Sequence, residues 1–205
     1  MTKYDRFIKK EFSFESNRER LKIVKGYDTG KAYCSENWAK RLGLYPLIQS
    51  HSIKKILDIG CGDGSFCIDM VEMGAEEVYG LDIASVVMGL TRESSSVKFI
   101  DGEAKNIPLA DNAVEFVTAF DVLEHVLPKD VDKVIEEMTR VASKGMLFSI
   151  DHKLSGEEVD GVNMHMCVEN SKWWVDKLSQ FWDVKVLNEK ESQVNSQILC
   201  INKRD

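Results

Sequence analysis

Carboxylate and imidazole side chains that could transfer a proton or hold a cation gather in the second half of the chain. Asp121, Glu124 and His125 stand close together in the segment FDVLEHV, and His152 and His165 follow downstream. Histidine changes its charge near neutral pH and is the natural general base for a hydroxyl group. Carboxylate and imidazole together also suit divalent cations such as magnesium or manganese. The residue types alone therefore permit either proton transfer or metal-assisted chemistry.

A second stretch, ILDIGCGDGSF at residues 56–66, joins an apolar run directly to alternating glycines. A glycine-rich turn after a buried strand lets backbone N–H groups approach a ligand closely at a helix N-terminus. The nucleotide-binding pattern G-x-x-x-x-G-K-[ST] fails because the stretch has no lysine, and the dinucleotide pattern G-x-G-x-x-G lacks its third glycine in either register. The pattern D-x-G-x-G-x-G is met in full, by Asp58, Gly60, Gly62 and Gly64.

The elements that must position these residues alternate between strand and helix. The predicted strands are Ile53–Ile59, Glu77–Ile83, Val97–Ile100, Ala113–Phe120, Met146–Ile150, Trp182–Leu187 and Ser196–Ile201. The predicted helices are Ser65–Met73, Ala84–Arg92, Lys129–Ala142 and Asn170–Phe181, with Gly74 ending the first and Gly145 the third. The alternation predicts an α/β fold with a mostly parallel sheet and helices on both faces, closed by an antiparallel pair of strands.

The first fifty residues differ from the remainder because they contain helical candidates, 18–25 and 35–49, and no strand. We therefore expect residues 1–50 to form a helical extension or lid, and residues 51–205 to form one domain.

The amino-acid composition narrows the classes of molecule that the protein could bind. A net charge of -7 argues against a standing affinity for nucleic acid or anionic membrane. No apolar run approaches the roughly 20 residues that span a bilayer, and we expect no signal peptide at the N-terminus. Five cysteines without a C-x-x-C pair suit free thiols in a reducing compartment. These features favour a cytoplasmic protein that acts on a small molecule.

Four motifs in register carry a family resemblance: the glycine stretch, LDIA after the second strand, DGEAKNIPLADNAVEFV, and FDVLEHV after the fourth strand. Together they resemble the class I S-adenosylmethionine-dependent methyltransferases, and among these the group that includes the ubiquinone and menaquinone biosynthesis enzymes. The resemblance covers roughly residues 53–150. It implies a Rossmann-like, doubly wound sheet of seven strands that is mostly parallel and has an antiparallel C-terminal strand.

The resemblance also implies how S-adenosylmethionine is held. Asp82 would accept hydrogen bonds from the ribose hydroxyls, Asp58 would lie near the ammonium group, and Asp101 would accept from the adenine amine. Phe120 and Asp121 would flank the methionine tail. The cofactor-binding residues expected in this way are Asp58, Gly60, Cys61, Gly62, Gly64, Asp82, Ile83, Asp101, Gly102, Glu103, Phe120 and Asp121.

The histidines are the candidates for catalysis. His165 is the first choice for a general base, and His152 and His125 are further candidates. Certain quinone-pathway and small-RNA methyltransferases similar to this chain carry E-x-x-E-H plus a distant histidine and bind a divalent cation there. Here Asp121 replaces the first glutamate, and L-E-H also occurs in family members without metal. The prediction is therefore a site without metal, in which Asp121, Glu124, His125 and His165 would be the ligands if a cation bound.

The predicted function is O-methylation of a sugar, a nucleotide-linked sugar or a similar metabolite, with S-adenosylmethionine as the cofactor. Two alternatives stay open. One is a protein or RNA methyltransferase, although FDVLEHV stands where an N-P-P-Y-type motif for methylation of base amino groups would lie. The other is a non-catalytic partner protein that keeps the fold and the cofactor.

Overall fold

The fold is described from a computed structural model, in which residues 52–83, 96–156, 158–159, 162–187 and 195–204 are described. The predicted N-terminal extension and the predicted helix at 84–92 lie outside these residues, as does His51. No helix in the described ranges combines the length and the apolar character needed to cross a membrane.

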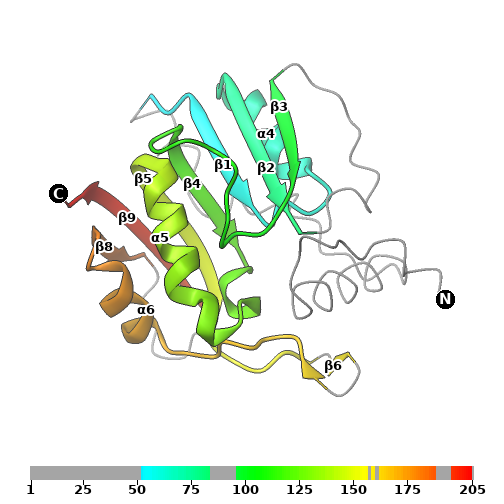
Figure 1. Cartoon of the computed structure of the whole chain (residues 1–205), viewed down its shortest axis with the longest axis vertical. Helices are drawn as coiled ribbons and strands as arrows, with labels where there is room; N and C mark the ends of the chain where they lie inside the picture. Colours follow the sequence, from blue (N-terminus) through cyan, green and yellow to red (C-terminus); the bar gives the residue numbers. More distant parts are fainter. Residues whose placement is uncertain (1–51, 84–95, 157, 160–161, 188–194, 205) are drawn as a thin grey trace.

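The centre of the domain is a sheet of seven strands in the order β3-β2-β1-β4-β5-β9-β8 (Figure 1). The strands are β1 (Lys55–Ile59), β2 (Glu77–Asp82), β3 (Val97–Asp101), β4 (Val114–Phe120), β5 (Ala142–Asp151), β8 (Trp182–Val186) and β9 (Asn195–Lys203). The first five run parallel to one another, and β9 is antiparallel to both β5 and β8. The sheet therefore confirms the predicted α/β fold and the antiparallel closing pair.

The chain reverses its direction across the sheet between β1 and β4. From β1 the chain passes to β2 and β3 on one side, and then returns across β1 to β4 and β5 on the other. In an open parallel sheet, ligands bind outside the carboxyl ends of the strands at such a point. The residues that follow β1, β2, β4 and β5 are thus brought to one edge.

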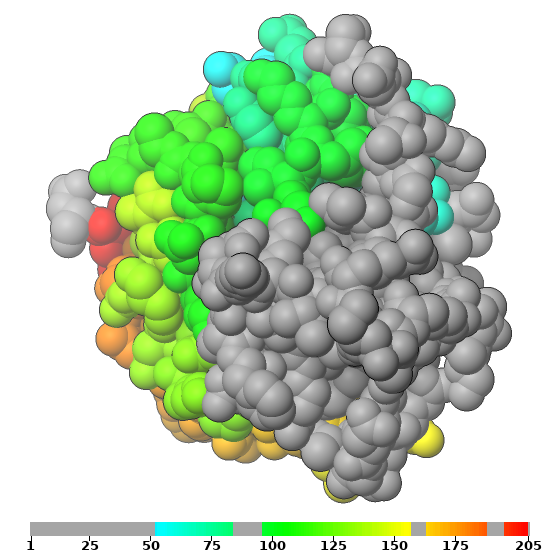
Figure 2. Space-filling view, turned by 45° about the vertical axis from the view of Figure 1, so that its right-hand side comes forward, coloured from blue at the N-terminus to red at the C-terminus, as the bar shows by residue number. Residues whose placement is uncertain are grey.

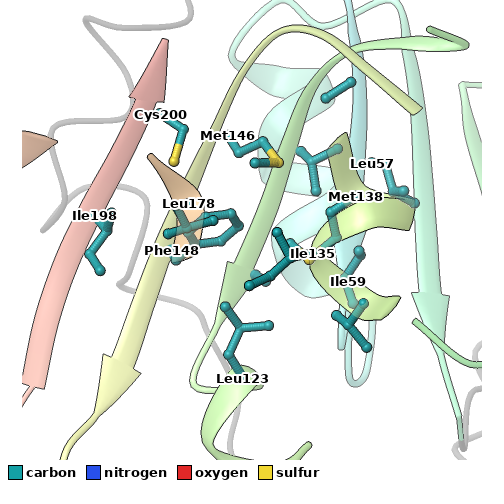
Figure 3. Packing of buried hydrophobic residues seen from close by; sticks show 14 of the residues in the cluster. Leu57, Ile59, Leu123, Ile135, Met138, Met146, Phe148, Leu178, Ile198 and Cys200 are labelled. Atoms are coloured by element: carbon teal, nitrogen blue, oxygen red, sulfur yellow. The ribbon is translucent and has the colours of Figure 1, made fainter. Parts of the chain in front are cut away.

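The two faces of the sheet are covered by different helices. Alternate residues of the strands point to opposite faces, so neighbours such as Ile56 and Leu57 enter separate clusters. One face packs against α5 (Val131–Val141) and α6 (Ser171–Leu178), and the other packs against α4 (Ser65–Glu72). Figure 3 shows the first cluster, where Ile135 and Met138 of α5 lie over strand residues such as Ile59. Full burial of each such side chain contributes about 1.5–3 kcal/mol.

One boundary prediction is wrong, because Gly145 does not end a helix. Helix α5 ends at Val141, and β5 begins at Ala142 without a loop. Gly145 lies inside β5, where a Cβ atom would stand 2.6 Å from Cε2 of Phe116 and 2.7 Å from the backbone oxygen of Cys200. This glycine is needed because neighbouring strands approach too closely for a side chain.

Helix α5 also holds the segment that connects β3 to β4. The carboxylate of Glu137 accepts a hydrogen bond from the Ile107 N–H group at 2.9 Å, and the Arg140 guanidinium donates to the Ile107 oxygen at 2.9 Å. Figure 2 shows this segment (green) and α5 (yellow-green) as neighbouring parts of one face. The residues that follow β3 are therefore fixed against the body of the domain.

Between β5 and α6 the chain forms an element that the sequence did not predict. Strands β6 (Glu158–Val159) and β7 (Val162–Asn163) pair in an antiparallel fashion as a short separate sheet. Figure 1 shows them at the end of an arm that leaves β5 and returns toward α6. The returning limb carries His165, whose ring meets that of His125 in the turn after β4.

Candidate cofactor and acceptor site

The glycine stretch forms a tight turn between β1 and α4. Gly60, Gly62 and Gly64 all adopt left-handed backbone angles, with φ values of 70°, 55° and 76°. The Gly60 N–H group donates to the Leu81 oxygen at 2.7 Å, which holds the turn against β2. A Cβ atom at Gly60 would lie 2.3 Å from Cγ2 of Val122, so neither the angle nor the space admits a side chain.

Asp82 ends β2 and faces this turn. Its carboxylate is buried, and Oδ2 accepts a hydrogen bond from the Gly62 N–H group at 3.0 Å. The backbone carbonyl oxygen of Asp82 accepts a hydrogen bond from the Gly102 N–H group at 3.1 Å. Asp82 therefore joins the glycine turn to the end of β3, where Asp101 is its partner in the sheet.

The other predicted cofactor residues on this side lie within the glycine turn or directly after β2 and β3. Cys61 is buried within the turn, and its N–H group donates to the Leu81 oxygen at 3.2 Å. Ile83 follows Asp82 directly, and Gly102 and Glu103 follow β3. Lys105 pairs with Glu103 at 3.4 Å.

Asp58 is a buried acid in β1, directly before the glycine turn. Its Oδ1 atom accepts a hydrogen bond from the Thr118 hydroxyl at 2.7 Å, and its Oδ2 atom lies 3.9 Å from the Cys67 sulfur, which donates to it. Burial raises the pKa of Asp58 from its ordinary value to about 7, and the negative charge of Asp82 acts in the same direction. A cationic ligand group beside Asp58 would favour its ionised form.

We expect Asp58 to make the ligand-free fold less stable as the pH rises from about 4 to about 7. The folded state keeps a proton that the unfolded chain loses near its ordinary pKa of 3.8, so the stabilisation is fully present below that pH and is lost through the folded pKa of about 7. The loss should be about 1–4 kcal/mol. Urea unfolding of the wild type and of Asp58→Asn at several pH values measures this loss of stability. Parallel pH profiles for the two proteins would contradict the assignment.

Phe120 and Asp121 lie where β4 ends. The Phe120 ring packs edge to face against Phe66 of α4, with ring centroids 5.2 Å apart. Asp121 adopts a left-handed φ of 54°, and its N–H group donates to the Ser149 backbone oxygen at 3.0 Å. The Ser149 hydroxyl in turn donates to Oδ1 of Asp121 at 2.7 Å. Asp121 is thus tied to β5 by both its backbone and its side chain.

Glu124, His125 and His165 come together from two separate segments. Each offers a nitrogen or oxygen donor atom, and these atoms all lie within 4.8 Å of one another. The two imidazole rings meet edge to face with centroids 4.9 Å apart. Glu124 is fully buried, and burial raises its pKa to about 8. Asp121, which the sequence grouped with these residues, does not belong to this group of three.

His152 stands apart from that group. One ring nitrogen lies 2.6 Å from the Glu169 backbone oxygen, and the other lies 2.6 Å from the Ser196 hydroxyl oxygen. Both nitrogens therefore connect β5 with neighbouring parts of the fold, and this arrangement favours a structural role over general base catalysis.

Sequence reasoning missed two residues at this edge. Asp151 ends β5, as Asp82 ends β2, and its N–H group donates to Oε1 of Glu124 at 3.0 Å. Among the described residues, Oδ1 of Asp151 is buried without a hydrogen-bond partner. The second missed residue is Ser149, whose hydroxyl and backbone oxygen both form hydrogen bonds with Asp121. The position of an acid at the end of a parallel strand would have pointed to Asp151.

Comparisons with known proteins agree with this geometry. A family model described as a methyltransferase domain matches residues 57–150. A demethylmenaquinone methyltransferase from Geobacillus sp. (strain WCH70) is 31% identical over 153 residues, which make up 64% of this chain and 62% of that protein. The chain therefore spans about three fifths of the length of this relative.

Solved structures show the same fold at lower identity. The PH0226 protein from Pyrococcus horikoshii OT3 has a TM-score of 0.61 at 21% identity, over 83% of this chain and 92% of its own. A structure from Listeria monocytogenes, described as a candidate S-adenosylmethionine dependent methyltransferase, has a TM-score of 0.60 at 16% identity, over 74% of this chain and 90% of its own. The family model and the relatives confirm the resemblance to methyltransferases that the sequence indicates, and the solved structures share the fold.

Proposed function

We propose that this chain transfers the methyl group of S-adenosylmethionine to a hydroxyl group of a small molecule, such as a sugar, a nucleotide-linked sugar or a similar metabolite. The observation that supports it best is the group formed by Glu124, His125 and His165, since these side chains could position a hydroxyl and lower its proton affinity. The group follows β4, and the glycine turn follows the adjacent strand β1.

The cofactor fits the residues at the glycine turn. Three left-handed glycines leave positions 60, 62 and 64 of the turn without side chains, and the buried Asp82 carboxylate suits the two ribose hydroxyls. Asp58 would receive the ammonium group of the methionine part, and Asp101 the adenine amine. Phe120 and Asp121 would then flank the methionine tail, so that the methyl group points toward the group of Glu124 and the two histidines.

The acidic composition favours a small acceptor over RNA, since the whole chain carries a net charge of -7. One relative suggests a second acceptor class. The name of the Geobacillus protein places its methyl group on demethylmenaquinone. A quinone is therefore the alternative acceptor to a sugar hydroxyl.

Transfer of a labelled methyl group tests the proposal. The full chain would be incubated with methyl-labelled S-adenosylmethionine and, separately, with metabolite, lipid-quinone, protein and RNA fractions. Label should enter the polar metabolite fraction, and Asp82→Ala should lose the incorporation. Label in the quinone fraction would support the second acceptor class. Label only in protein or RNA, or no label at all with intact cofactor binding, would overturn the proposal.

His165→Ala should lower the rate of methyl transfer by about 10²–10⁴-fold, the usual contribution of a group that handles the proton of an acceptor. The His165 ring contacts His125 and the Lys153 backbone oxygen, and neither of these residues lies in the glycine turn. The dissociation constant for S-adenosylmethionine should therefore change little. Single-turnover rates and calorimetry measure the two effects. An unaltered rate of methyl transfer would show that His165 has only a structural role.

A further inference from the structure

Three carboxylates gather where β4 and β5 end. Asp121 follows β4, Glu124 lies in the 3-10 turn Leu123–His125, and Asp151 ends β5. The Asp151 N–H group donates to Oε1 of Glu124 at 3.0 Å, and the Ser149 hydroxyl donates to Oδ1 of Asp121 at 2.7 Å. Burial raises the pKa of Glu124, and the negative charges of Asp121 and Asp151 act in the same direction. These three residues, called the acidic cluster below, are therefore close neighbours.

Two oxygen atoms of the acidic cluster are buried and unpaired. Oε2 of Glu124 and Oδ1 of Asp151 have no hydrogen-bond partner within the described ranges. The Glu124 side chain is buried completely. Because a buried carboxylate oxygen without a partner is costly, this pair of oxygens points to a ligand that donates hydrogen bonds to both.

The cluster also lacks a compensating positive charge. Lysines and arginines in the described part of the chain pair with other acids, such as Lys105 with Asp130 and Lys177 with Asp132, and none of them pairs with a member of the cluster. Like charges held close together disfavour one another, and burial makes the effect stronger. A ligand with a positive charge would relieve this repulsion.

His165 presents a hydrogen-bond acceptor beside the cluster. Its Nδ1 atom lies 2.6 Å from the Lys153 backbone oxygen, which can only accept, so Nδ1 carries the hydrogen and Nε2 carries the lone pair. The donor atoms of His165, His125 and Glu124 all lie within 4.8 Å of one another. A proton acceptor and unpaired acidic oxygens therefore stand side by side.

We propose that the acidic cluster binds an ammonium group of the methyl acceptor, and that the acceptor is a metabolite with an amine next to the methylated hydroxyl, as in an amino sugar. This inference rests on the proposed transfer to a hydroxyl. An ammonium group offers three N–H donors and one positive charge, so it can serve Oε2 of Glu124 and Oδ1 of Asp151 together. A neutral hydroxyl offers one donor and leaves one of these oxygens unpaired.

The ammonium group also directs the methyl group to oxygen. Carboxylates stabilise the protonated form of an amine, which has no lone pair with which to attack. The hydroxyl oxygen forms the new bond to the methyl carbon, and its proton passes to Nε2 of His165. The bond between the methyl carbon and sulfur breaks with its electron pair on sulfur, and S-adenosylhomocysteine leaves.

A comparison of two sugars tests the site without any need for turnover. The full chain with S-adenosylhomocysteine, in buffer with EDTA, would be titrated with glucosamine and with glucose and followed by saturation-transfer nuclear magnetic resonance. Glucosamine should bind at least about tenfold more tightly than glucose, because only its ammonium group meets the acidic cluster. Equal affinities, or a preference that appears only without EDTA, would overturn the proposal.

Two conservative variants assign the preference to the cluster. Glu124→Gln keeps the Oε1 acceptor for the Asp151 N–H group, and Asp151→Asn keeps the shape of its side chain. Each should remove most of the preference for glucosamine and leave the affinity for glucose unchanged. Asp176→Asn is the matched control, since this exposed acid of α6 pairs with Lys172 at 2.5 Å and should behave like the wild type.

Calorimetry with S-adenosylmethionine on the same variants separates the acceptor from the cofactor, which has an ammonium group of its own. Glu124→Gln and Asp151→Asn should bind S-adenosylmethionine as the wild type does. Weaker cofactor binding in both variants would assign the cluster to the methionine part and overturn the proposal.

Selective acetylation of amines in the polar metabolite fraction separates this inference from the proposed function. Methyl label should enter the untreated fraction and be lost after acetylation. Label that survives acetylation would leave transfer to a hydroxyl in place and overturn the ammonium site. A preference for glucosamine without methyl transfer to any fraction would support the ammonium site and count against the proposed function.

Discussion

Replacing Gly60 by alanine is expected to lower the free energy of unfolding by about 2–5 kcal/mol and to abolish measurable S-adenosylmethionine binding. The first cause is conformational, because a left-handed φ of 70° is costly for alanine. The second is steric, since the new Cβ atom would lie 2.3 Å from Cγ2 of Val122. Urea unfolding and calorimetry measure the two losses.

Two other glycines separate these causes. Gly74→Ala adds strain without a clash, because its φ is 106° and nothing lies within 4 Å of the added Cβ atom. Gly156→Ala also has open space, and its φ lies outside the left-handed range, so it should be nearly neutral. The double variant Gly60→Ala with Val122→Ala removes the clashing methyl groups and should recover part of the stability. Equal stability of Gly60→Ala and Gly156→Ala would show that the turn tolerates a side chain.

Replacing Asp82 by alanine is expected to weaken S-adenosylmethionine binding by at least about tenfold, which corresponds to a charge-assisted contact of about 1.5–3 kcal/mol. The structure adds a second reason. Oδ2 of Asp82 accepts the Gly62 N–H group at 3.0 Å, so alanine also removes one of the hydrogen bonds that hold the glycine turn to β2. Calorimetry on the folded variant gives the affinity.

Asp82→Asn distinguishes these two contributions, because its amide oxygen can still accept from Gly62 while the charge is lost. We expect an affinity between those of the wild type and Asp82→Ala. Asp183→Asn serves as the control, since Asp183 lies on β8 and pairs with Arg204 at 3.2 Å, outside the glycine turn. If Asp82→Ala bound the cofactor as tightly as the wild type, Asp82 would not belong to the cofactor site.

The sequence predicted the parts of the fold that depend on local patterns. The D-x-G-x-G-x-G stretch and the alternation of apolar strands with helices each reflect a local physical requirement, and the structure has the corresponding elements. Gly145 was misread because glycine ends helices and also serves where strands crowd together. Only the pairing of β5 with β4 and β9 distinguishes these two uses.

The candidate acceptor site was harder to predict because it is made by long-range contacts. The sequence named Asp121, Glu124, His125 and His165 as one group, but the ties between Asp121 and Ser149 depend on two strands that meet only in the sheet. Similarly, the hydrogen bonds of His152 to Glu169 and Ser196 link residues far apart in sequence. Such contacts leave no periodic pattern in a single sequence.

The place of β9 has a consequence for synthesis on the ribosome. This strand inserts between β5 and β8, although it is made after both of them. Until β9 has emerged, the outer edge of β5 has no neighbour among the described strands, and neither has β8. Unpaired strand edges recruit other chains, so a nascent chain that pauses at this stage exposes an aggregation-prone edge. The sheet is therefore complete only after β9 has been synthesised, because this strand takes an interior place between β5 and β8.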